Sequence, residues 1–381
     1  MIYYGKQSVS EEDIQAVAEV LRSPYITQGP AVERFERRVA EYCGAKYAVA
    51  VTSATAALHI ACRALGLGEG DQLWTSPITF VASANCGLYC GADVDFVDID
   101  ADTYNMGVDE LEEKLAAGGR PKVVVPVHLC GQSCDMERIH ALAQKYAFSV
   151  IEDASHAVGA IYQDTHVGSC KFSDMTVFSF HPVKIITAGE GGMILTNRKE
   201  LYEELLLLRG HFITRDASRM THEPDGEWYY QQIGLGYNYR MTDFQAALGW
   251  SQMNRLEKFV ERRRALAKRY NELLEGLPLH VPYQRPDTNS SWHLYVVRLA
   301  LDRTKRSKQE IFAEMRQRGV QLNLHYIPVH TQPYYRNLGF RQGDFPVSEK
   351  YYEEAVTLPI YYDLTDEQQE IVVRALKEVL A

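Results

Sequence analysis

The feature that most constrains the fold is an alternation, over residues 47–153, of short apolar runs with segments of helical pattern. The runs are rich in valine and other β-branched residues, as in KVVVPVHL and FSVIED. Strands of this kind are buried on both faces of a sheet, with helices connecting parallel neighbours and covering the sheet. The sequence therefore predicts an α/β fold with a mostly parallel central sheet.

The pattern changes toward the C-terminus. A long helical stretch, residues 242–274, is followed by WHLYVVRLAL, which predicts a strand, and then by two further helical segments. This mixture predicts a smaller α+β domain over residues 251–381, after a large domain over residues 1–250. No proline- or glycine-rich linker separates the two domains, so we expect them to pack closely.

Charge and cysteine content argue against several classes of function. The 381 residues carry a formal net charge of −10, which argues against nonspecific nucleic-acid binding. The seven cysteines show neither C-x-x-C spacing nor histidines at zinc-ligand spacing, so we expect free thiols, a reducing compartment and no metal site. No signal-peptide pattern and no apolar run near the ~20 residues of a membrane span occur, so we predict a soluble cytoplasmic protein with no membrane partner.

One lysine stands in an unusual setting, the segment FSFHPVKIITAGEGG at residues 178–192. Pro182 and the glycines predict a loop, and a lone loop lysine is most often a surface residue. The aromatic and apolar neighbours of Lys184, however, predict partial dehydration, which lowers the pKa of an amine and frees it for nucleophilic attack. Such an amine is best suited to a Schiff base with a carbonyl, as in enzymes that use pyridoxal phosphate.

A lysine that holds pyridoxal phosphate needs accessory groups, and candidates occur in order along the chain. Asp153 follows a buried strand, where it is placed to keep the pyridine nitrogen protonated. Thr52, Ser53 and Thr55 stand between a strand and a helix, where hydroxyls and backbone N–H groups bind phosphate. Ser179, five residues before the lysine, adds a further hydroxyl.

The aromatic ring of the cofactor also needs a flat apolar face, for which Phe80 in PITFVASAN is the candidate. Each of these residues has an ordinary structural explanation as well: Asp153 as a turn or cap residue, Ser53 as a helix N-cap, and Phe80 as part of the core. Their combination favours a pyridoxal-phosphate enzyme. A nicotinamide-dependent reductase is disfavoured, because GLGEGD at residues 66–71 precedes a strand instead of opening a helix after one.

With these residues the chain resembles the DegT/StrS-type sugar-nucleotide aminotransferases, which have the aspartate aminotransferase-like fold (pyridoxal-phosphate fold type I). The resemblance covers nearly the whole chain and is carried by ITQGPAVERFE, SATAALHIA, PITFVASANC, IEDASHAVGA, FSFHPVK…GEGG and GYNYRMTDFQAALG. It implies Lys184 as the Schiff-base lysine and Asp153 as the partner of the pyridine nitrogen. It also implies a set of cofactor contacts: Ala54, Thr55 and Ser179 at the phosphate, Phe80 stacked on the ring and His156 beside it.

The resemblance further implies an assembly. Asn238, in GYNYRMTD, is implied to reach the cofactor phosphate of a neighbouring subunit, which implies a homodimer with shared active sites. The segments FSFHPVK and HYIPVHTQPYY are similar to a branch that aminates the C4 ketone of UDP-2-acetamido-2,6-dideoxy-β-L-arabino-hex-4-ulose in pseudaminic acid biosynthesis. L-Glutamate is then the expected amino donor, and 2-oxoglutarate and UDP-4-amino-4,6-dideoxy-N-acetyl-β-L-altrosamine are the expected products.

The substrate-binding residues are less constrained. The nucleotide diphosphate needs cations, and the sugar and donor need polar contacts, but a surface or interface position is an equally good explanation for every candidate. The candidates are Lys6, Thr27, Arg209, His211, Arg240, His325 and Tyr326.

Three alternative functions stay open. A different nucleotide-linked 4-keto-6-deoxy sugar would leave the chemistry unchanged. A sugar dehydratase is disfavoured, because relatives with that activity carry histidine where this chain has Lys184. A regulatory or sugar-binding module is expected to lose Lys184 or Asp153, or to gain a DNA-binding segment, and neither is seen.

Overall fold

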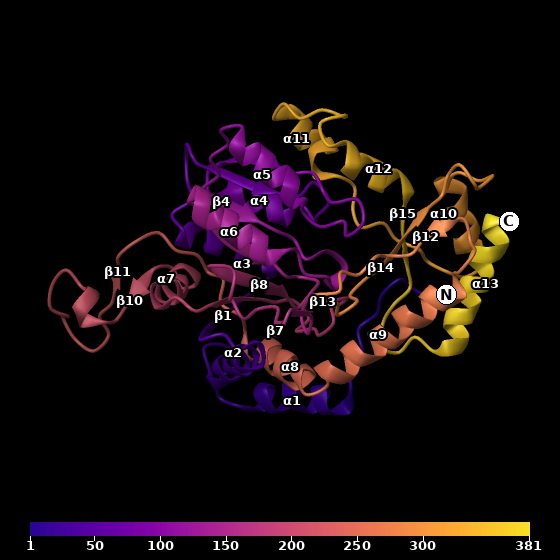
Figure 1. The fold of residues 1–381 in the computed structure, drawn as a ribbon. Helices are drawn as coiled ribbons and strands as arrows, with labels where there is room; N and C mark the ends of the chain where they lie inside the picture. Colours follow the sequence, from indigo (N-terminus) through magenta and orange to yellow (C-terminus); the bar gives the residue numbers. More distant parts are fainter.

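A computed structural model describes residues 1–381 of the chain (Figure 1). Its centre is a seven-stranded sheet made of β1 (Tyr47–Val51), β9 (Gly192–Thr196), β8 (Met175–Ser179), β5 (Ser149–Asp153), β4 (Val123–Val125), β2 (Gln72–Thr75) and β3 (Asp93–Phe96), in that spatial order. Neighbours from β8 to β3 are parallel, and β9 alone runs antiparallel, to both β8 and β1. The predicted α/β fold with a mostly parallel sheet is confirmed.

Alternate residues of the strands face two different cores. In β1, Val49 and Val51 belong to one apolar cluster and Ala48 and Ala50 to another, as the two-residue period of a strand requires. The first cluster includes residues of α3 (Ala54–Ala64), α4 (Ala82–Tyr89) and α7 (Lys199–Arg209), and the second includes residues of α2 (Pro30–Cys43) and α8 (Asp243–Met253). A further cluster holds α5 (Val108–Ala116) and α6 (Met136–Tyr146). Helices therefore cover both faces of the sheet.

The strand directions place several connecting loops at one edge. Because β9 is antiparallel to both of its neighbours, β1 points the same way as β8, β5, β4 and β2. The segments that follow these strands therefore leave the sheet on the same side. In open α/β sheets, ligands bind at this carboxyl edge.

A second, smaller core lies at the right of Figure 1. It contains an antiparallel sheet, β12 (Leu279–His280), β14 (Tyr295–Leu299) and β15 (Ala355–Leu358), with α9 (Leu256–Leu273), α10 (Lys308–Gln317) and α13 (Asp366–Leu380). These elements have the predicted α+β character, while the boundary at residue 251 stays a prediction. The first residues of the chain also reach this core, because Ile2 is buried there and pairs with Val320.

Two elements differ in extent from the sequence prediction. The helical stretch 242–274 is two helices, α8 and α9, because Arg255 leaves helical geometry and its guanidinium binds the buried carboxylate of Asp13 in α1 (Glu11–Arg22). The strand expected from KVVVPVHL ends at Val125, because Pro126 has no N–H for the ladder. Both differences follow from single residues that interrupt an otherwise regular pattern.

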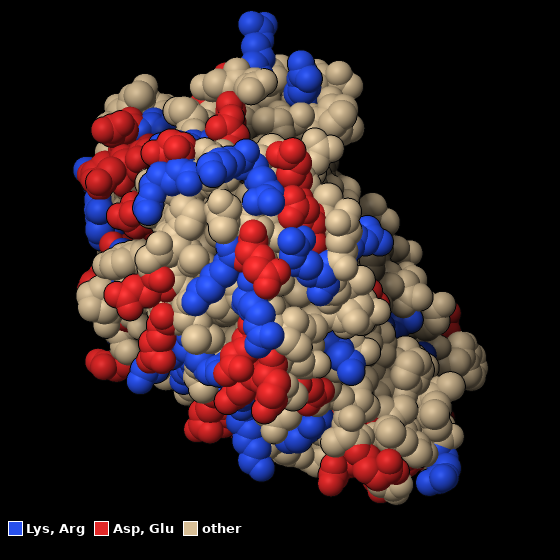
Figure 2. Space-filling model, turned by 90° about the vertical axis from the view of Figure 1, so that its right-hand side faces the viewer, with Lys and Arg blue, Asp and Glu red and all other residues tan.

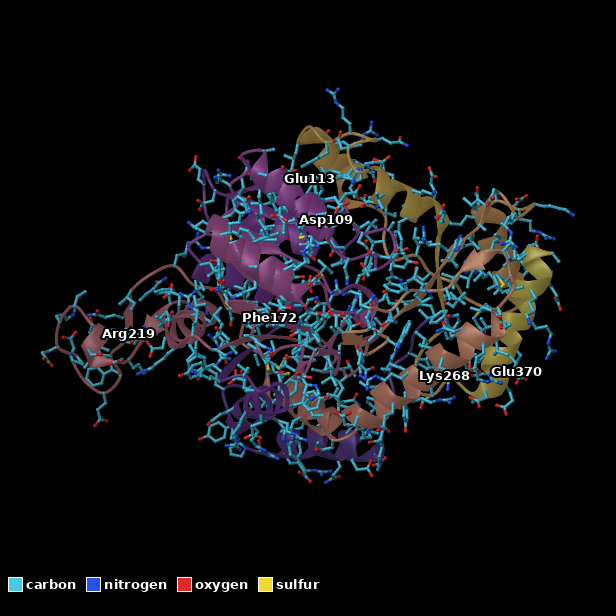
Figure 3. The ribbon with its side chains drawn as sticks, viewed as in Figure 1. Asp109, Glu113, Phe172, Arg219, Lys268 and Glu370 are labelled. Atoms are coloured by element: carbon cyan, nitrogen blue, oxygen red, sulfur yellow. The ribbon has the colours of Figure 1, made fainter.

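An arm extends from the body at the left of Figure 1. It is built on the pair β10 (Ile213–Thr214) and β11 (Gln231–Gln232), and Arg219, labelled in Figure 3, lies on it. Trp228 is 74% exposed and Leu235 is 72% exposed. The remaining elements are a small sheet of β6 (Ile161–Tyr162), β7 (Thr165–His166) and β13 (Thr288–Asn289), and the helices α11 (Pro333–Asn337) and α12 (Pro346–Glu354).

The face at the right of Figure 1 is shown in Figure 2. Acidic and basic side chains are interspersed on it, without a region of one sign. Several ion pairs tie the helices of the second core together, including Arg269 with Glu370 between α9 and α13. No helix of the structure combines the length and the apolar character that crossing a membrane requires.

Candidate active site

A cavity of about 540 Å³ lies at the carboxyl edge of the central sheet. All of the predicted cofactor-binding residues except Asn238 line it: Ser53, Ala54, Thr55, Phe80, Asp153, His156, Ser179 and Lys184. They come from the segments that follow β1, β2, β5 and β8, whose carboxyl ends share this edge. Thr52, also expected near the phosphate, does not line the cavity, and its N–H binds the Tyr239 carbonyl at 2.9 Å.

Lys184 stands in the predicted loop, and its side-chain amine has no hydrogen-bond partner in the protein. Only its backbone N–H is bonded, to the carbonyl of His181 at 2.9 Å. Burial lowers the pKa of Lys184 to about 8, although the nearby carboxylate of Asp153 acts in the opposite direction. The amine therefore has a substantial neutral fraction near pH 8, as a nucleophile or proton carrier requires.

Asp153 ends β5 and is held by two hydrogen bonds. Ser83 Oγ donates to Oδ2 at 2.6 Å, and the backbone N–H of Ser155 donates to Oδ1 at 3.1 Å. Ser83 is fully buried in α4, and its hydroxyl also lies 2.6 Å from that of Thr79. The sequence prediction missed Ser83, although it lies within PITFVASANC, the run that contains Phe80.

The start of α3 provides donors without acceptors. Ser53 is the N-cap, and its Oγ accepts the N–H of Ala56 at 3.1 Å. The N–H groups of Ala54 and Thr55 belong to the first helical turn and have no partner, and the Thr55 and Ser179 hydroxyls donate to no protein group. Free donors at a helix N-terminus suit an anionic phosphate.

A glycine of the GEGG run supports this arrangement. A Cβ on Gly192 would lie 2.5 Å from the carbonyl carbon and oxygen of Ser53 and 2.6 Å from the nitrogen of Ala54. Only glycine permits β9 to pass this close to the start of α3. The glycine cluster thus shapes the end of the cavity formed by the start of α3, in addition to ending the lysine loop.

Aromatic and imidazole rings form another part of the cavity wall. Phe80 is 59% exposed, and its ring centroid lies 6.2 Å from that of Tyr326. His156 accepts the N–H of Cys130 at Nδ1 (3.4 Å), so its proton is on Nε2, which lies 3.1 Å from the Tyr326 hydroxyl. Burial, with the charge of Lys184, lowers the pKa of His156 well below its ordinary value. An exposed ring at Phe80 beside a neutral imidazole suits a planar aromatic ligand.

Only some of the predicted substrate-binding residues lie at the cavity. His325 and Tyr326 line the cavity, whereas Lys6 is exposed and borders a small neighbouring pocket that Lys184 also touches. Arg209 does not reach the cavity, because its Nη1 binds Glu36 Oε1 at 2.5 Å and the Ala50 carbonyl at 2.9 Å. The structure thus assigns Arg209 to an internal ion pair and does not support its expected contact with substrate.

Four other predicted residues also lie outside the cavity of their own subunit. They are Thr27, His211, Asn238 and Arg240. Three of them form isolated backbone bridges: Thr27 with Thr242, Asn238 with Gly210, and Arg240 with Val51. Lys184 is consequently the only lysine or arginine among the lining residues. The lining also includes Tyr4, Glu190, His293 and Asn323, which the sequence prediction missed. His293 lies within WHLYVVRLAL, where a histidine in an apolar run was the available signal.

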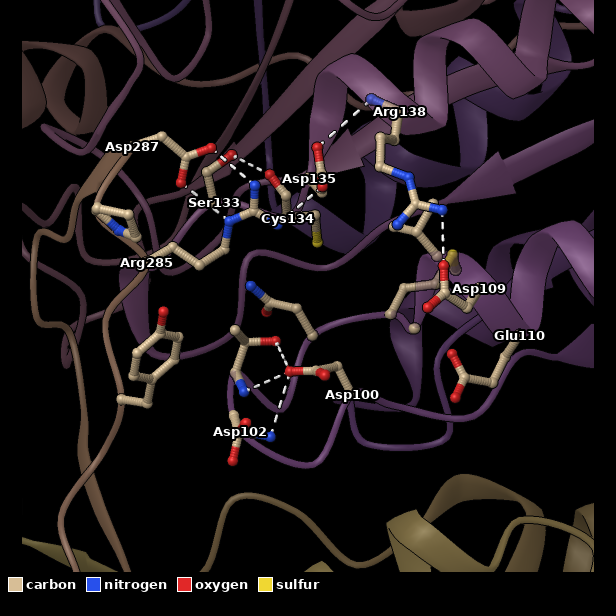
Figure 4. A pocket seen from close by; sticks show the side chains of 17 residues that line it. Asp100, Asp102, Asp109, Glu110, Ser133, Cys134, Asp135, Arg138, Arg285 and Asp287 are labelled. Atoms are coloured by element: carbon tan, nitrogen blue, oxygen red, sulfur yellow. Dashed lines mark hydrogen bonds and ion pairs between the residues drawn. The ribbon is translucent and has the colours of Figure 1, made fainter.

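A second cavity, of about 560 Å³, lies near α5 and α6 and is shown in Figure 4. It contains none of the predicted site residues, and many of its side chains are acidic. Its arginines are already paired: Arg285 with Asp135 and Asp287, and Arg138 with Asp109. Since these charges satisfy one another, the cavity at the sheet edge is the better candidate for catalysis.

Comparison with known proteins agrees with this geometry. Residues 7–377 match the model of the DegT/DnrJ/EryC1/StrS aminotransferase family. Spore coat polysaccharide biosynthesis protein SpsC of Bacillus subtilis is 38% identical over 380 residues, which is 99% of this chain and 96% of that protein.

Two solved structures are similar over nearly their full length. One is Helicobacter pylori PseC, an aminotransferase involved in the biosynthesis of pseudoaminic acid, with a TM-score of 0.92, 30% identity, and coverage of 100% of this chain and 99% of that chain. The other is the putative sugar aminotransferase Spr1654 from Streptococcus pneumoniae in its PMP form, with a TM-score of 0.91 and 31% identity. The match covers 99% of this chain and 98% of that chain. The chain therefore belongs to the DegT/DnrJ/EryC1/StrS aminotransferase family, whose members are pyridoxal-phosphate-dependent sugar aminotransferases.

Proposed function

We propose that this protein transfers the amino group of L-glutamate to the C4 ketone of UDP-2-acetamido-2,6-dideoxy-β-L-arabino-hex-4-ulose. The products are UDP-4-amino-4,6-dideoxy-N-acetyl-β-L-altrosamine and 2-oxoglutarate. The observation that carries the reaction is the unpaired amine of Lys184 in a cavity that also holds Asp153. The full-length similarity to PseC, together with FSFHPVK and HYIPVHTQPYY, supports the choice of sugar.

The residues of the cavity fit pyridoxal phosphate. The free N–H groups of Ala54 and Thr55 would bind its phosphate, Asp153 its ring nitrogen, and Phe80 one face of its ring. When bound, the cofactor supplies the carbonyl that takes up the amino group and an electron-poor ring that stabilises negative charge. Asp153, fixed by Ser83, keeps the ring nitrogen protonated.

Lys184 is the proposed proton carrier. Its amine would take a proton from the Cα of the amino donor and deliver it to the cofactor. With a pKa near 8, the amine can both gain and lose this proton without a large energetic cost. In the second half of the reaction the same amine would deliver a proton to the C4 carbon of the sugar. One lysine then serves two substrates in turn, so we expect ping-pong kinetics.

We further propose a homodimer with shared active sites. The cofactor phosphate and the diphosphate of UDP are anionic, but Lys184 is the only lysine or arginine in the cavity wall of one subunit. Additional cations must therefore come from elsewhere, and Arg240, outside the cavity of its own subunit, is a candidate. The exposed Trp228 and Leu235 on the arm supply apolar surface for the contact.

The cofactor's visible absorbance tests the reaction. We expect a band in the purified protein that is lost on addition of L-glutamate, returns with the UDP-linked 4-keto sugar, and is absent in Lys184→Ala. A band that glutamate leaves unchanged would contradict the proposed donor. Repeating the last step with the epimeric 4-keto sugar tests the stereochemistry.

Mixing two inactive variants tests the shared site. Lys184→Ala removes the Schiff-base lysine, and Asn238→Ala removes the proposed contact to the partner's cofactor. If Asn238 acts across the interface, a mixed dimer contains one site with both native residues. We therefore expect activity to return after the two proteins are unfolded together and refolded. Activity that does not return, with both variants dimeric by light scattering, would place Asn238 outside the partner's site.

A second candidate substrate is a different nucleotide-linked 4-keto-6-deoxy sugar. The observation that favours it is the identity of 38% with SpsC, a spore coat polysaccharide biosynthesis protein, against 30% with PseC. Restoration of the absorbance band by another 4-keto sugar, and not by the L-arabino compound, would select this candidate.

A further inference from the structure

His293 is a cavity residue whose imidazole is not used by the protein. The residue is 4% exposed and lines the cavity with Lys184. Neither ring nitrogen has a hydrogen-bond partner: Nδ1 is enclosed, whereas Nε2 is not. Because His293 lines the cavity and its Nε2 is neither enclosed nor bonded to the protein, Nε2 is available to a ligand there.

Of the other three histidines of the wall, His181 is exposed, and the two buried ones are already occupied. His156 accepts from the Cys130 N–H and lies within hydrogen-bonding distance of Tyr326. His325 Nδ1 lies 2.8 Å from the Thr357 hydroxyl, and its Nε2 lies 3.4 Å from Nδ2 of Asn323. His293, whose ring centroid is 4.5 Å from that of His156, is thus the buried histidine of the wall with free hydrogen-bonding capacity.

The backbone around His293 is fixed at considerable cost. Trp292, immediately before it, adopts the left-handed conformation with φ of 51°, which is strained for a bulky residue. The buried Arg263 has no acidic partner, and its Nη1 donates instead to the carbonyls of Trp292, His293 and Ile360 at 3.0 to 3.2 Å. The carbonyl bonds from Arg263 hold the backbone at Trp292 and His293, and backbone strain of this kind is typical of functional sites.

The charge state of His293 restricts what it can bind. Burial, and then the nearby His156, Lys184 and Arg263, lower its pKa well below the ordinary value, so the ring is neutral. The Nε2 of a neutral imidazole either donates or accepts one hydrogen bond, and a hydroxyl group can match it in both cases, whereas the charge of a carboxylate is best met by a cation. The contact therefore belongs with the sugar and not with the amino donor.

We propose that Nε2 of His293 binds the C3 hydroxyl of the sugar in the amino-acceptor half of the reaction. This inference rests on the proposed function. In the proposed substrate C1 carries UDP, C2 the acetamido group, C4 the ketone and C6 no oxygen, so C3 has the only free hydroxyl of the ring. His293 then determines how the sugar is oriented when its C4 carbon approaches Lys184.

Two substitutions separate hydrogen bonding from packing. His293→Phe keeps a ring of similar size, and we expect it to weaken binding of the amino-sugar product by roughly 3- to 10-fold, the value of one neutral hydrogen bond. His293→Gln keeps a donor and an acceptor near Nε2 and should restore most of this loss. Binding is measured by calorimetry, and the rate of cofactor bleaching by L-glutamate should change less than about twofold in both variants.

A sugar analogue gives an independent readout that does not depend on the Phe variant folding. The wild-type protein should bind the 3-deoxy amino sugar more weakly than the parent compound, and substitution of His293 should abolish this difference. His166→Phe is the matched control, because His166 also has an unpaired enclosed Nδ1 but lies outside the cavity. The role of His293 would be overturned if the wild-type protein did not distinguish the two sugars. It would also be overturned if substitution of His293 slowed the glutamate step as much as it weakened sugar binding.

The same experiment distinguishes this inference from the proposed function. Wild-type protein that neither binds the parent amino sugar nor responds to any 4-keto sugar would overturn the proposed function, and the inference with it. Wild-type protein that turns over the sugar while all His293 variants behave normally would overturn the inference alone.

Discussion

Ser83 Oγ donates a 2.6 Å hydrogen bond to Oδ2 of Asp153, and the two residues belong to different elements, α4 and β5. Ser83 is fully buried and Asp153 is nearly so, which limits competition from water for this bond. The bond fixes the carboxylate at the carboxyl edge of the sheet, in the cavity that contains Lys184. A short hydrogen bond to a carboxylate is among the stronger side-chain interactions.

Ser83→Ala should therefore reduce kcat with little change in KM for L-glutamate. A hydrogen bond to a charged group contributes about 1.5–3 kcal/mol, so we expect a loss of about tenfold or more in kcat. Ser76→Ala is the control, because the Ser76 hydroxyl is buried and has no partner. Equal kinetic losses in both variants would show that packing, and not the bond to Asp153, is responsible.

The lowered pKa of Lys184 predicts how the cofactor-free protein captures pyridoxal phosphate. Only the neutral amine attacks, so the capture rate should rise with pH and level off above a midpoint near 8, instead of near the ~10.4 of a free lysine. Asp153 raises the pKa of Lys184, so Asp153→Asn should move the midpoint below 8. Stopped-flow absorbance measures the rate, and a midpoint that moves upward in Asp153→Asn would contradict the assignment.

Arg209→Gln should destabilise the protein without changing KM for the nucleotide sugar. Removing the guanidinium leaves the mostly buried carboxylate of Glu36 with the Ala50 N–H alone, at a cost of up to about 3 kcal/mol. Arg37→Gln, which breaks the exposed pair with Glu41, should cost about 0.5 kcal/mol or less. Thermal melting and steady-state kinetics test both, and a raised KM at unchanged stability would restore Arg209 as a substrate contact.

Glu152, next to Asp153 in β5, should stabilise the fold in a pH-dependent way. Burial alone would raise its pKa, but hydrogen bonds from His128, Ser173 and Thr176 outweigh this effect and lower it. A carboxyl group with a lowered pKa stabilises the fold above its ordinary pKa of about 4.5, and this stabilisation is lost as the pH falls below that value.

Glu152→Gln should accordingly be less stable than the wild type at pH 7, and its thermal midpoint should fall less on acidification. Glu200→Gln is the matched control, since Glu200 is exposed and paired only with Arg198. Parallel pH profiles for Glu152→Gln and the wild type would show that Glu152 is not the group that titrates.

Part of the site could be predicted because its signals are local. Ser53 and Thr55 stand between β1 and α3, and Lys184 stands in a loop that proline and glycine impose. The alternation of buried strands and helices determines that such loops meet at one edge of a parallel sheet. Strand periodicity and turn chemistry act over a few residues, so they can be read from a single sequence.

The contacts between distant residues were decided by the tertiary structure alone. Ser83 and Asp153 are 70 positions apart, and Arg209 and Glu36 are 173 apart, so no local pattern relates them. Whether a cation binds a ligand or an internal carboxylate depends on where its side chain points once the helices have packed. The sequence by itself thus determined the parallel sheet, the lysine loop and the turn between β1 and α3, and packing determined which polar side chains remain free to act.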